Sequence, residues 1–114
     1  MKNHSRSEPG LARNYRQLQR RLSSLGYITQ GSVLERRPPQ QGSRYVWTRK
    51  VRARTVTVAL SKEQYQWMRR AVANQREVER IVGQMQRLSR QVLFKTLPDI
   101  RRHKPLNKRV LGLI

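Results

Sequence analysis

The apolar positions near the start of the chain recur at alternating spacings of four and three residues. This spacing places them along one face of a helix and predicts an amphipathic segment. Gly26 follows the last apolar position and is expected to end the helix, because glycine commonly follows a final helical turn. The predicted apolar face comprises Leu11, Tyr15, Leu18, Leu22 and Leu25.

The middle of the chain has the composition of strands. Residues 44–52 and 54–60 are rich in Tyr, Trp, Val and Thr and flank a tight break near Ala53, which predicts a β-hairpin. The segment Ile28–Arg36 is expected to add a third antiparallel strand, and the prolines and glycine of 37–43 mark a loop. Period-two alternation predicts an apolar face of Tyr45, Trp47, Val51, Val56, Val58 and Leu60. The opposite, basic and hydroxylated face would carry Arg44, Thr48, Lys50, Arg52, Thr55 and Thr57.

A long helix is predicted after the hairpin. Ser61 and Gln64 match a capping box, and the next proline is Pro98, so the helix can continue to about Lys95. Its apolar positions follow a near-heptad seam that exceeds what the first helix can cover. We therefore expect pairing along Ala71 to Val92 with the first helix, with a second copy or with a partner helix. The seam comprises Ala71, Val78, Ile81, Met85, Leu88 and Val92.

Together these elements predict an α+β fold: a short N-terminal helix, a β-hairpin or three-stranded antiparallel sheet, and a long C-terminal helix. Residues 1–10 are expected to be a flexible leader, residues 11–97 a single α+β domain, and residues 98–114 a basic tail.

Charge gives the first indication of function. Lys and Arg number 26 against 6 Asp and Glu in 114 residues, a formal net charge of +20. Such an excess opposes compaction unless a polyanion neutralises it, and most of the cations are arginines, whose planar guanidinium groups pair well with phosphate. A polyanionic partner, DNA or RNA, is therefore expected.

Composition also limits the compartment and the chemistry. Cysteine is absent, which excludes disulfides, thiolate metal sites and thiol catalysis. No apolar run is long enough for a membrane span, and the first ten residues lack the apolar core of a signal peptide, so we expect a cytoplasmic protein.

Four short motifs stand out in the middle of the chain: Gly31-Ser-Val-Leu-Glu-Arg36, Arg44-Tyr-Val-Trp-Thr-Arg-Lys-Val51, Thr55-Val-Thr-Val58 and Ala73-Asn-Gln-Arg76. Together they resemble the pattern of a family of small uncharacterised bacterial proteins. Members are often encoded near transposase genes, and many carry a cysteine cluster that this chain replaces with 37–43. The resemblance implies no established activity, and it implies nucleic acid only by association with mobile elements.

Two groups of cations are candidate phosphate contacts. Arg69, Arg76, Arg80 and Arg87 fall on a narrow strip of the long helix, and Arg44, Lys50, Arg52 and Arg54 lie on or beside the polar face of the hairpin. The alternatives are a solvated arginine face and a polar edge that prevents aggregation. Tyr45 and Trp47 would stack on bases or, as such residues do more often, fill the core.

No catalytic or metal-binding constellation is visible. His4 and His103 have no neighbouring ligand at metal spacing, and the carboxylates are scattered, so neither an enzyme nor a cofactor is expected.

The sequence thus predicts a nucleic-acid-binding protein that contacts the phosphate backbone with little sequence preference, as an accessory to a mobile element or ribonucleoprotein. The alternative is a helix-mediated interaction module with an acidic protein partner. A third reading, peripheral membrane binding, depends on the short apolar cluster from Leu111 to Ile114.

Overall fold

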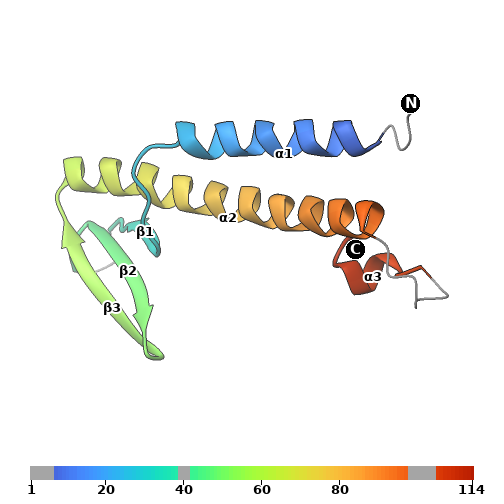
Figure 1. Cartoon of the computed structure of the whole chain (residues 1–114). Coiled ribbons are helices and arrows are strands. Elements are labelled where there is room, and N and C mark those ends of the chain that lie inside the picture. Colours follow the sequence, from blue (N-terminus) through green and yellow to red (C-terminus); the bar gives the residue numbers. More distant parts are fainter. Residues whose placement is uncertain (1–6, 39–41, 98–104) are drawn as a thin grey trace. The chain divides into compact units, whose positions relative to one another are not determined.

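The computed structural model describes residues 7–38, 42–97 and 105–114 and has the predicted α+β layout. A short N-terminal helix precedes a three-stranded antiparallel sheet, and a long helix follows (Figure 1). The elements are α1 (Ser7–Ser24), β1 (Ser32–Glu35), β2 (Tyr45–Val51), β3 (Arg54–Leu60), α2 (Lys62–Thr96) and α3 (Lys108–Leu111).

The chain divides into two compact units, where the sequence predicted one domain over 11–97. The sheet unit is Leu25–Val78, and the helical unit consists of the described residues of Met1–Ser24 and Glu79–Ile114. Helix α1 already begins at Ser7, inside the expected leader, while the rest of that leader lies outside the described residues. The expected basic tail contains α3, and its residues 98–104 also lie outside the described part of the chain.

The sheet has the order β1-β2-β3, with both pairings antiparallel. Strand β1 pairs only with residues 45–48 of β2, from Glu35 opposite Tyr45 to Ser32 opposite Thr48. Strand β3 pairs along the whole of β2, from Leu60 opposite Tyr45 to Arg54 opposite Val51. The far half of the hairpin therefore consists of β2 and β3 alone, a two-stranded ribbon. Figure 1 shows these two strands extending beyond β1.

The hairpin turn lies where the sequence predicted it, with Arg52 and Ala53 as its two central residues. Both have positive φ, 49° and 67°, as a type I′ turn requires. Neither is glycine, so each adopts a left-handed conformation that costs on the order of 1 kcal/mol. The right-handed twist of the two flanking strands favours this turn over the unstrained types.

A tryptophan fixes the start of the sheet. The indole Nε1 of Trp47 donates a hydrogen bond to the carbonyl oxygen of Gln30 at 2.9 Å. Next to Gln30, Gly31 has a φ of 115°, and a Cβ there would overlap the Trp47 ring and the carbonyl oxygen of Thr48. Glycine is therefore required at this position for β1 to pair with β2.

The predicted capping box forms at the start of α2. The backbone N–H of Gln64 donates to the hydroxyl oxygen of Ser61 at 3.1 Å, and the N–H of Ser61 donates to Oε1 of Gln64 at 2.9 Å. These bonds satisfy two donors that would otherwise lack helical partners. The helix continues for 35 residues, about 50 Å at 1.5 Å per residue.

The hairpin contributes to the core differently from the prediction. Val46 is only 2% exposed, yet the register places it on the face of Thr48 and Lys50, which the alternation had assigned as polar. On the predicted apolar face, Val56 and Val58 remain 36% and 40% exposed. The physical reason is position in the sheet: Val46 lies on the central strand between Leu34 and Ala59, whereas Val56 and Val58 lie on the edge strand β3.

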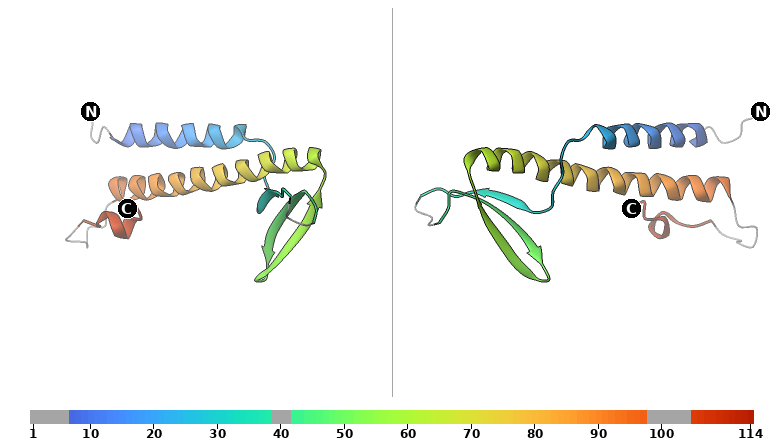
Figure 2. Two further views of the ribbon diagram at one scale, coloured as in Figure 1. Left: turned by 180° about the vertical axis from the view of Figure 1, so that it is seen from behind. Right: turned by 60° about the vertical axis from the view of Figure 1, so that its left-hand side comes forward.

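In the helical unit, α1 runs alongside the second half of α2, and both views in Figure 2 show this arrangement. Four of the five predicted apolar residues lie on α1 and are partly buried, and its four arginines from Arg13 to Arg21 are exposed. The fifth, Leu25, follows the end of the helix and belongs to the sheet unit. On α2, Ile81 is completely buried. The predicted amphipathic character of both helices is thus present in the structure.

Candidate nucleic-acid interface

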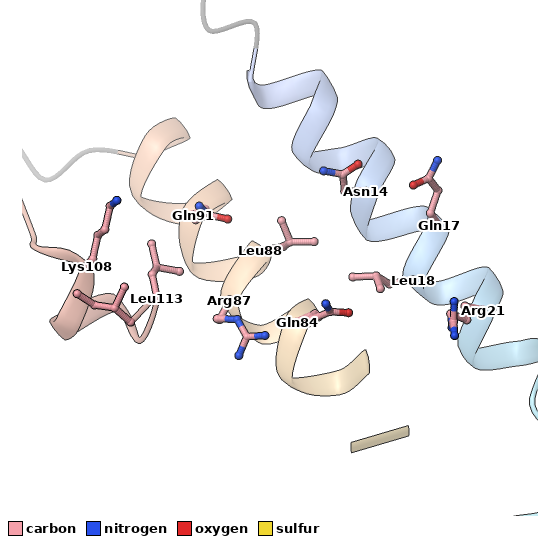
Figure 3. A pocket seen from close by; sticks show the side chains of 11 residues that line it. Asn14, Gln17, Leu18, Arg21, Gln84, Arg87, Leu88, Gln91, Lys108 and Leu113 are labelled. Carbon is pink, nitrogen blue, oxygen red and sulfur yellow. The ribbon is translucent and has the colours of Figure 1, made fainter. Parts of the chain in front are cut away.

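A groove of about 860 Å³ lies in the helical unit, between α1, the second half of α2 and the C-terminal segment (Figure 3). Three short segments, far apart in the sequence, supply its walls. Its lining residues are Asn14, Gln17, Leu18 and Arg21 from α1; Gln84, Arg87, Leu88 and Gln91 from α2; and Lys108, Leu113 and Ile114.

Cations enter this groove from all three segments. Arg21 comes from α1, Arg87 from α2 and Lys108 from α3 (Figure 3). Among the described residues that line the groove, none is acidic. The combination favours an anion, because three positive charges share one concave surface with no carboxylate side chain on its walls.

The rest of the lining is amide and apolar. Four amide side chains, Asn14, Gln17, Gln84 and Gln91, provide hydrogen-bond donors and acceptors. Leu18 and Leu88 point toward each other between the two helices (Figure 3). Amides beside guanidinium groups suit the phosphate and sugar groups of a nucleic-acid backbone.

The position of Lys108 depends on a well-capped turn. Asn107 caps α3 by accepting the N–H of Val110 on Oδ1 at 2.8 Å, and Gly112 ends α3 with a left-handed φ of 74°. The guanidinium of Arg90 on α2 donates to the carbonyl oxygen of Leu111 at 3.2 Å. Arg90 thereby attaches the C-terminal segment to α2 and holds Lys108 at the groove.

The four arginines predicted as a phosphate track are all exposed on α2 but divide between the units. Arg69 and Arg76 belong to the sheet unit, and Arg80 and Arg87 to the helical unit. Arg80 donates to Oε1 of Gln84 at 3.3 Å. Of the four, Arg87 alone lines the groove.

Arg21 and Lys108 were not among the predicted phosphate contacts, although the sequence places Arg21 off the apolar face of its helix, toward solvent or a ligand, and Lys108 in the basic tail. A signal existed for Arg21, because Asn14, Gln17 and Arg21 follow one another at spacings of three and four and so share a helix face beside Leu18. No periodicity could reveal Lys108. Its place depends on the Arg90 contact, which joins residues 21 positions apart.

The hairpin cations do not form a single face. Lys50 lies with Thr48 and Thr55 as predicted, whereas Arg54 pairs with Val51 on the Trp47 face, and Arg52 lies in the turn. Arg49, which the prediction omitted, shares the Trp47 face, and its guanidinium carbon lies 5.5 Å from the Trp47 ring centroid. The exposed ribbon thus carries cations on both faces, Arg49, Lys50, Arg52 and Arg54.

Arg44 differs from these cations because a carboxylate already compensates its charge. It precedes β2, and its Nε and Nη2 atoms lie 3.3 and 3.0 Å from Oε2 of Glu35. The hydrogen bond from Arg44 lowers the pKa of Glu35, and the same bond raises the pKa of Arg44. Arg44 therefore ties the loop before β2 to β1 and offers less net charge to a polyanion.

The surroundings of Tyr45 and Trp47 favour a role in packing over base stacking. The ring centroid of Tyr45 lies 4.7 Å from that of Tyr65 on α2, and the indole N–H of Trp47 donates to the carbonyl oxygen of Gln30. Both rings are partly buried. Neither is available to stack fully on a base.

The α2 seam is already covered in part by the chain itself. Ala71 is 2% exposed and Ile81 is completely buried, without any second copy. Val78, Met85, Leu88 and Val92 are partly buried. The largest apolar exposures toward the end of α2 are instead at Leu93 and Phe94, with Leu97 just beyond.

Two kinds of feature are absent from the described residues. No group of three or more histidines and carboxylates there has the arrangement of a metal site. None of the helices in that part of the chain is both long enough and apolar enough to cross a membrane. No family model matches the chain, and no curated protein or solved structure shows significant similarity to it.

Proposed function

We propose that the protein binds nucleic acid, DNA or RNA, through the phosphate backbone and with little sequence preference. One observation carries the proposal: Arg21, Arg87 and Lys108, from three segments, line one groove whose described lining includes no acidic side chain. Amide groups beside them supply contacts to phosphate and sugar oxygens. A net charge of +20 would draw any polyanion toward this surface.

The exposed hairpin ribbon is the second contact surface of the proposal. Its cations project on both faces, and threonine hydroxyls accompany them, as in β-ribbons that lie along a nucleic-acid groove. Contacts of this kind position the protein without reading bases. The proposal assigns no catalytic step to any residue and places the protein as an accessory to a mobile element or ribonucleoprotein.

The alternative, a helix-mediated module with an acidic protein partner along Ala71 to Val92, is the weaker proposal. Its seam has two positions, Ala71 and Ile81, that are buried within the single chain. A partner helix would therefore have to displace contacts that the chain already makes.

A competition experiment separates the two. A labelled duplex DNA is bound to the purified, nuclease-treated protein, and equal charge concentrations of unlabelled duplex DNA, single-stranded DNA, RNA and polyglutamate are added as competitors. Nucleic acids should displace the label, and polyglutamate should compete far less, because carboxylates are spaced differently from phosphates and carry no sugar or base. Equal competition by polyglutamate would favour the acidic-protein alternative, and failure to bind the label would refute the proposed function.

A further inference from the structure

Two large aromatic side chains of the sheet unit are exposed side by side. Tyr27 is 76% exposed and Trp67, on α2, is 45% exposed. Their ring centroids lie 5.3 Å apart with the planes tilted by 38°. Aromatic rings of this size usually bury most of their surface, so an exposed pair indicates a binding surface.

The backbone beneath this pair is anchored. Nδ2 of Asn74 donates to the carbonyl oxygen of Tyr27 at 3.0 Å, and the N–H of Thr29 donates to the carbonyl oxygen of Ala71 at 3.2 Å. Ala71 and Val72 are 2% and 4% exposed, so the helix supporting the pair is part of the core. The rings are thus presented by fixed backbone, which lowers the entropy cost of binding.

A pocket of about 480 Å³ opens at this pair. Tyr27, Trp67, Arg70 and Asn74 line it together with Gly26, and among the described lining residues there is no carboxylate. Arg70 is exposed, lies about one helical turn after Trp67 and lines the same pocket. Two exposed aromatic rings therefore adjoin a guanidinium group and an amide.

We propose that this pocket, the aromatic pocket, binds an unpaired nucleobase of single-stranded nucleic acid. The base stacks on Tyr27 and Trp67, and Arg70 contacts the phosphate next to it. A base within a duplex is stacked on its neighbours and hides both faces, so this contact requires a single strand. The inference rests on the proposed function and adds to it the strand state of the ligand.

Other planar ligands fit the chemistry less well. An isolated aromatic compound would stack on Tyr27 and Trp67 without contacting Arg70. An acidic peptide would contact Arg70 without stacking on the two rings. A single-stranded nucleic acid presents a ring and an anion about one nucleotide apart, and the net charge of +20 favours it further.

The test uses the full chain and four oligonucleotides of equal length: oligothymidylate, oligouridylate, an abasic strand with the same number of phosphates, and a duplex. Tryptophan emission and fluorescence anisotropy are followed together. Stacking should quench Trp67, and the quenching should disappear in Trp67→Phe, because the remaining Trp47 is engaged within the sheet unit. Oligothymidylate and oligouridylate should both bind more tightly than the abasic strand, and a difference between them shows which sugar is preferred.

Two variants measure the contribution of the pocket. Trp67→Ala should weaken binding of oligothymidylate by about 5- to 150-fold, the range that one base–aromatic stack contributes, and leave the duplex and the abasic strand unchanged. Tyr27→Ser tests the same pocket from an exposed loop and retains the backbone carbonyl that Asn74 uses. Phe94→Ala is the matched control, because Phe94 is an aromatic residue of α2 with a similar exposure, 41%.

The outcomes separate the two proposals. Equal affinity for the abasic strand and oligothymidylate, or unchanged affinity in both pocket variants, would overturn the stacking site and leave phosphate binding intact. An equal loss in Phe94→Ala would also overturn it. Absence of binding to every oligonucleotide would refute the proposed function itself.

Discussion

At the scale of single residues, charge is distributed unevenly even on so basic a chain. Glu35 has Arg44 at 3.0 Å and Arg37 at 3.9 Å, so one carboxylate serves two guanidinium groups. Arg44 is the larger influence on its pKa, which lies below the ordinary value. The sequence placed Arg44 among the phosphate contacts, because spacing alone could not show that β1 brings Glu35 beside it.

Replacing Arg44 should undo the lowering of the Glu35 pKa. In Arg44→Gln, the pKa of Glu35 should rise toward its ordinary value, and in Arg37→Gln it should rise less, since Arg37 acts only through its charge at longer range. The lowered pKa means that the ion pair stabilises the fold above the ordinary pKa of glutamate and that this contribution is lost as the pH falls through the lowered value. NMR titration of the Glu35 carboxyl carbon measures both variants. A larger rise in Arg37→Gln than in Arg44→Gln would contradict the assignment.

At the scale of elements, local sequence signals predicted most of the fold. The capping box at Ser61 and the turn at Ala53 form where expected, because both depend on a few neighbouring residues. The burial of Val46 did not follow from alternation, because it depends on the central place of β2 between two neighbouring strands. Helix α3 was also missed, since a four-residue helix has too few turns to show a periodicity.

Two glycine substitutions should act in opposite directions. Gly112→Ala forces a side chain into a left-handed position with its Cβ 2.8 Å from Nη1 of Arg90, so the C-terminal turn should loosen at a cost of about 1 kcal/mol. Gly10 lies within α1, and a Cβ there would meet nothing within 4 Å. Gly10→Ala should therefore stabilise the protein by up to about 1 kcal/mol.

Hydrogen exchange measures the loosening of the turn in Gly112→Ala, and denaturant unfolding measures the gain in stability of Gly10→Ala. The amide of Leu113, which donates to the carbonyl oxygen of Lys108 at 2.8 Å, should exchange faster in Gly112→Ala and not in Gly10→Ala. Unchanged exchange at Leu113 would mean that the capped turn does not hold Lys108 at the groove.

At the scale of the whole molecule, the candidate site depends on contacts between distant segments. The sequence predicted Arg87, because its helix is long and periodic. It did not predict the groove, because its lining comes from three segments far apart in the sequence, and one of them is attached to α2 by the Arg90 contact. The excess of cations was evident from composition, whereas the surface on which three of them converge follows only from the fold.

The salt dependence of duplex DNA binding reports whether Arg21, Arg87 and Lys108 contact phosphate groups. If Arg21, Arg87 and Lys108 each displace about one counterion, changing all three to Gln should flatten the slope of log affinity against log salt concentration by about 2.7 units. The matched control changes Arg13, Arg16 and Arg20 to Gln, which removes the same charge from exposed positions that do not line the groove. Circular dichroism checks that both variants keep their helices. The account predicts a change in slope of less than about one unit for the control. Equal slopes for the groove variant and the wild-type protein, or equal flattening in both variants, would contradict it.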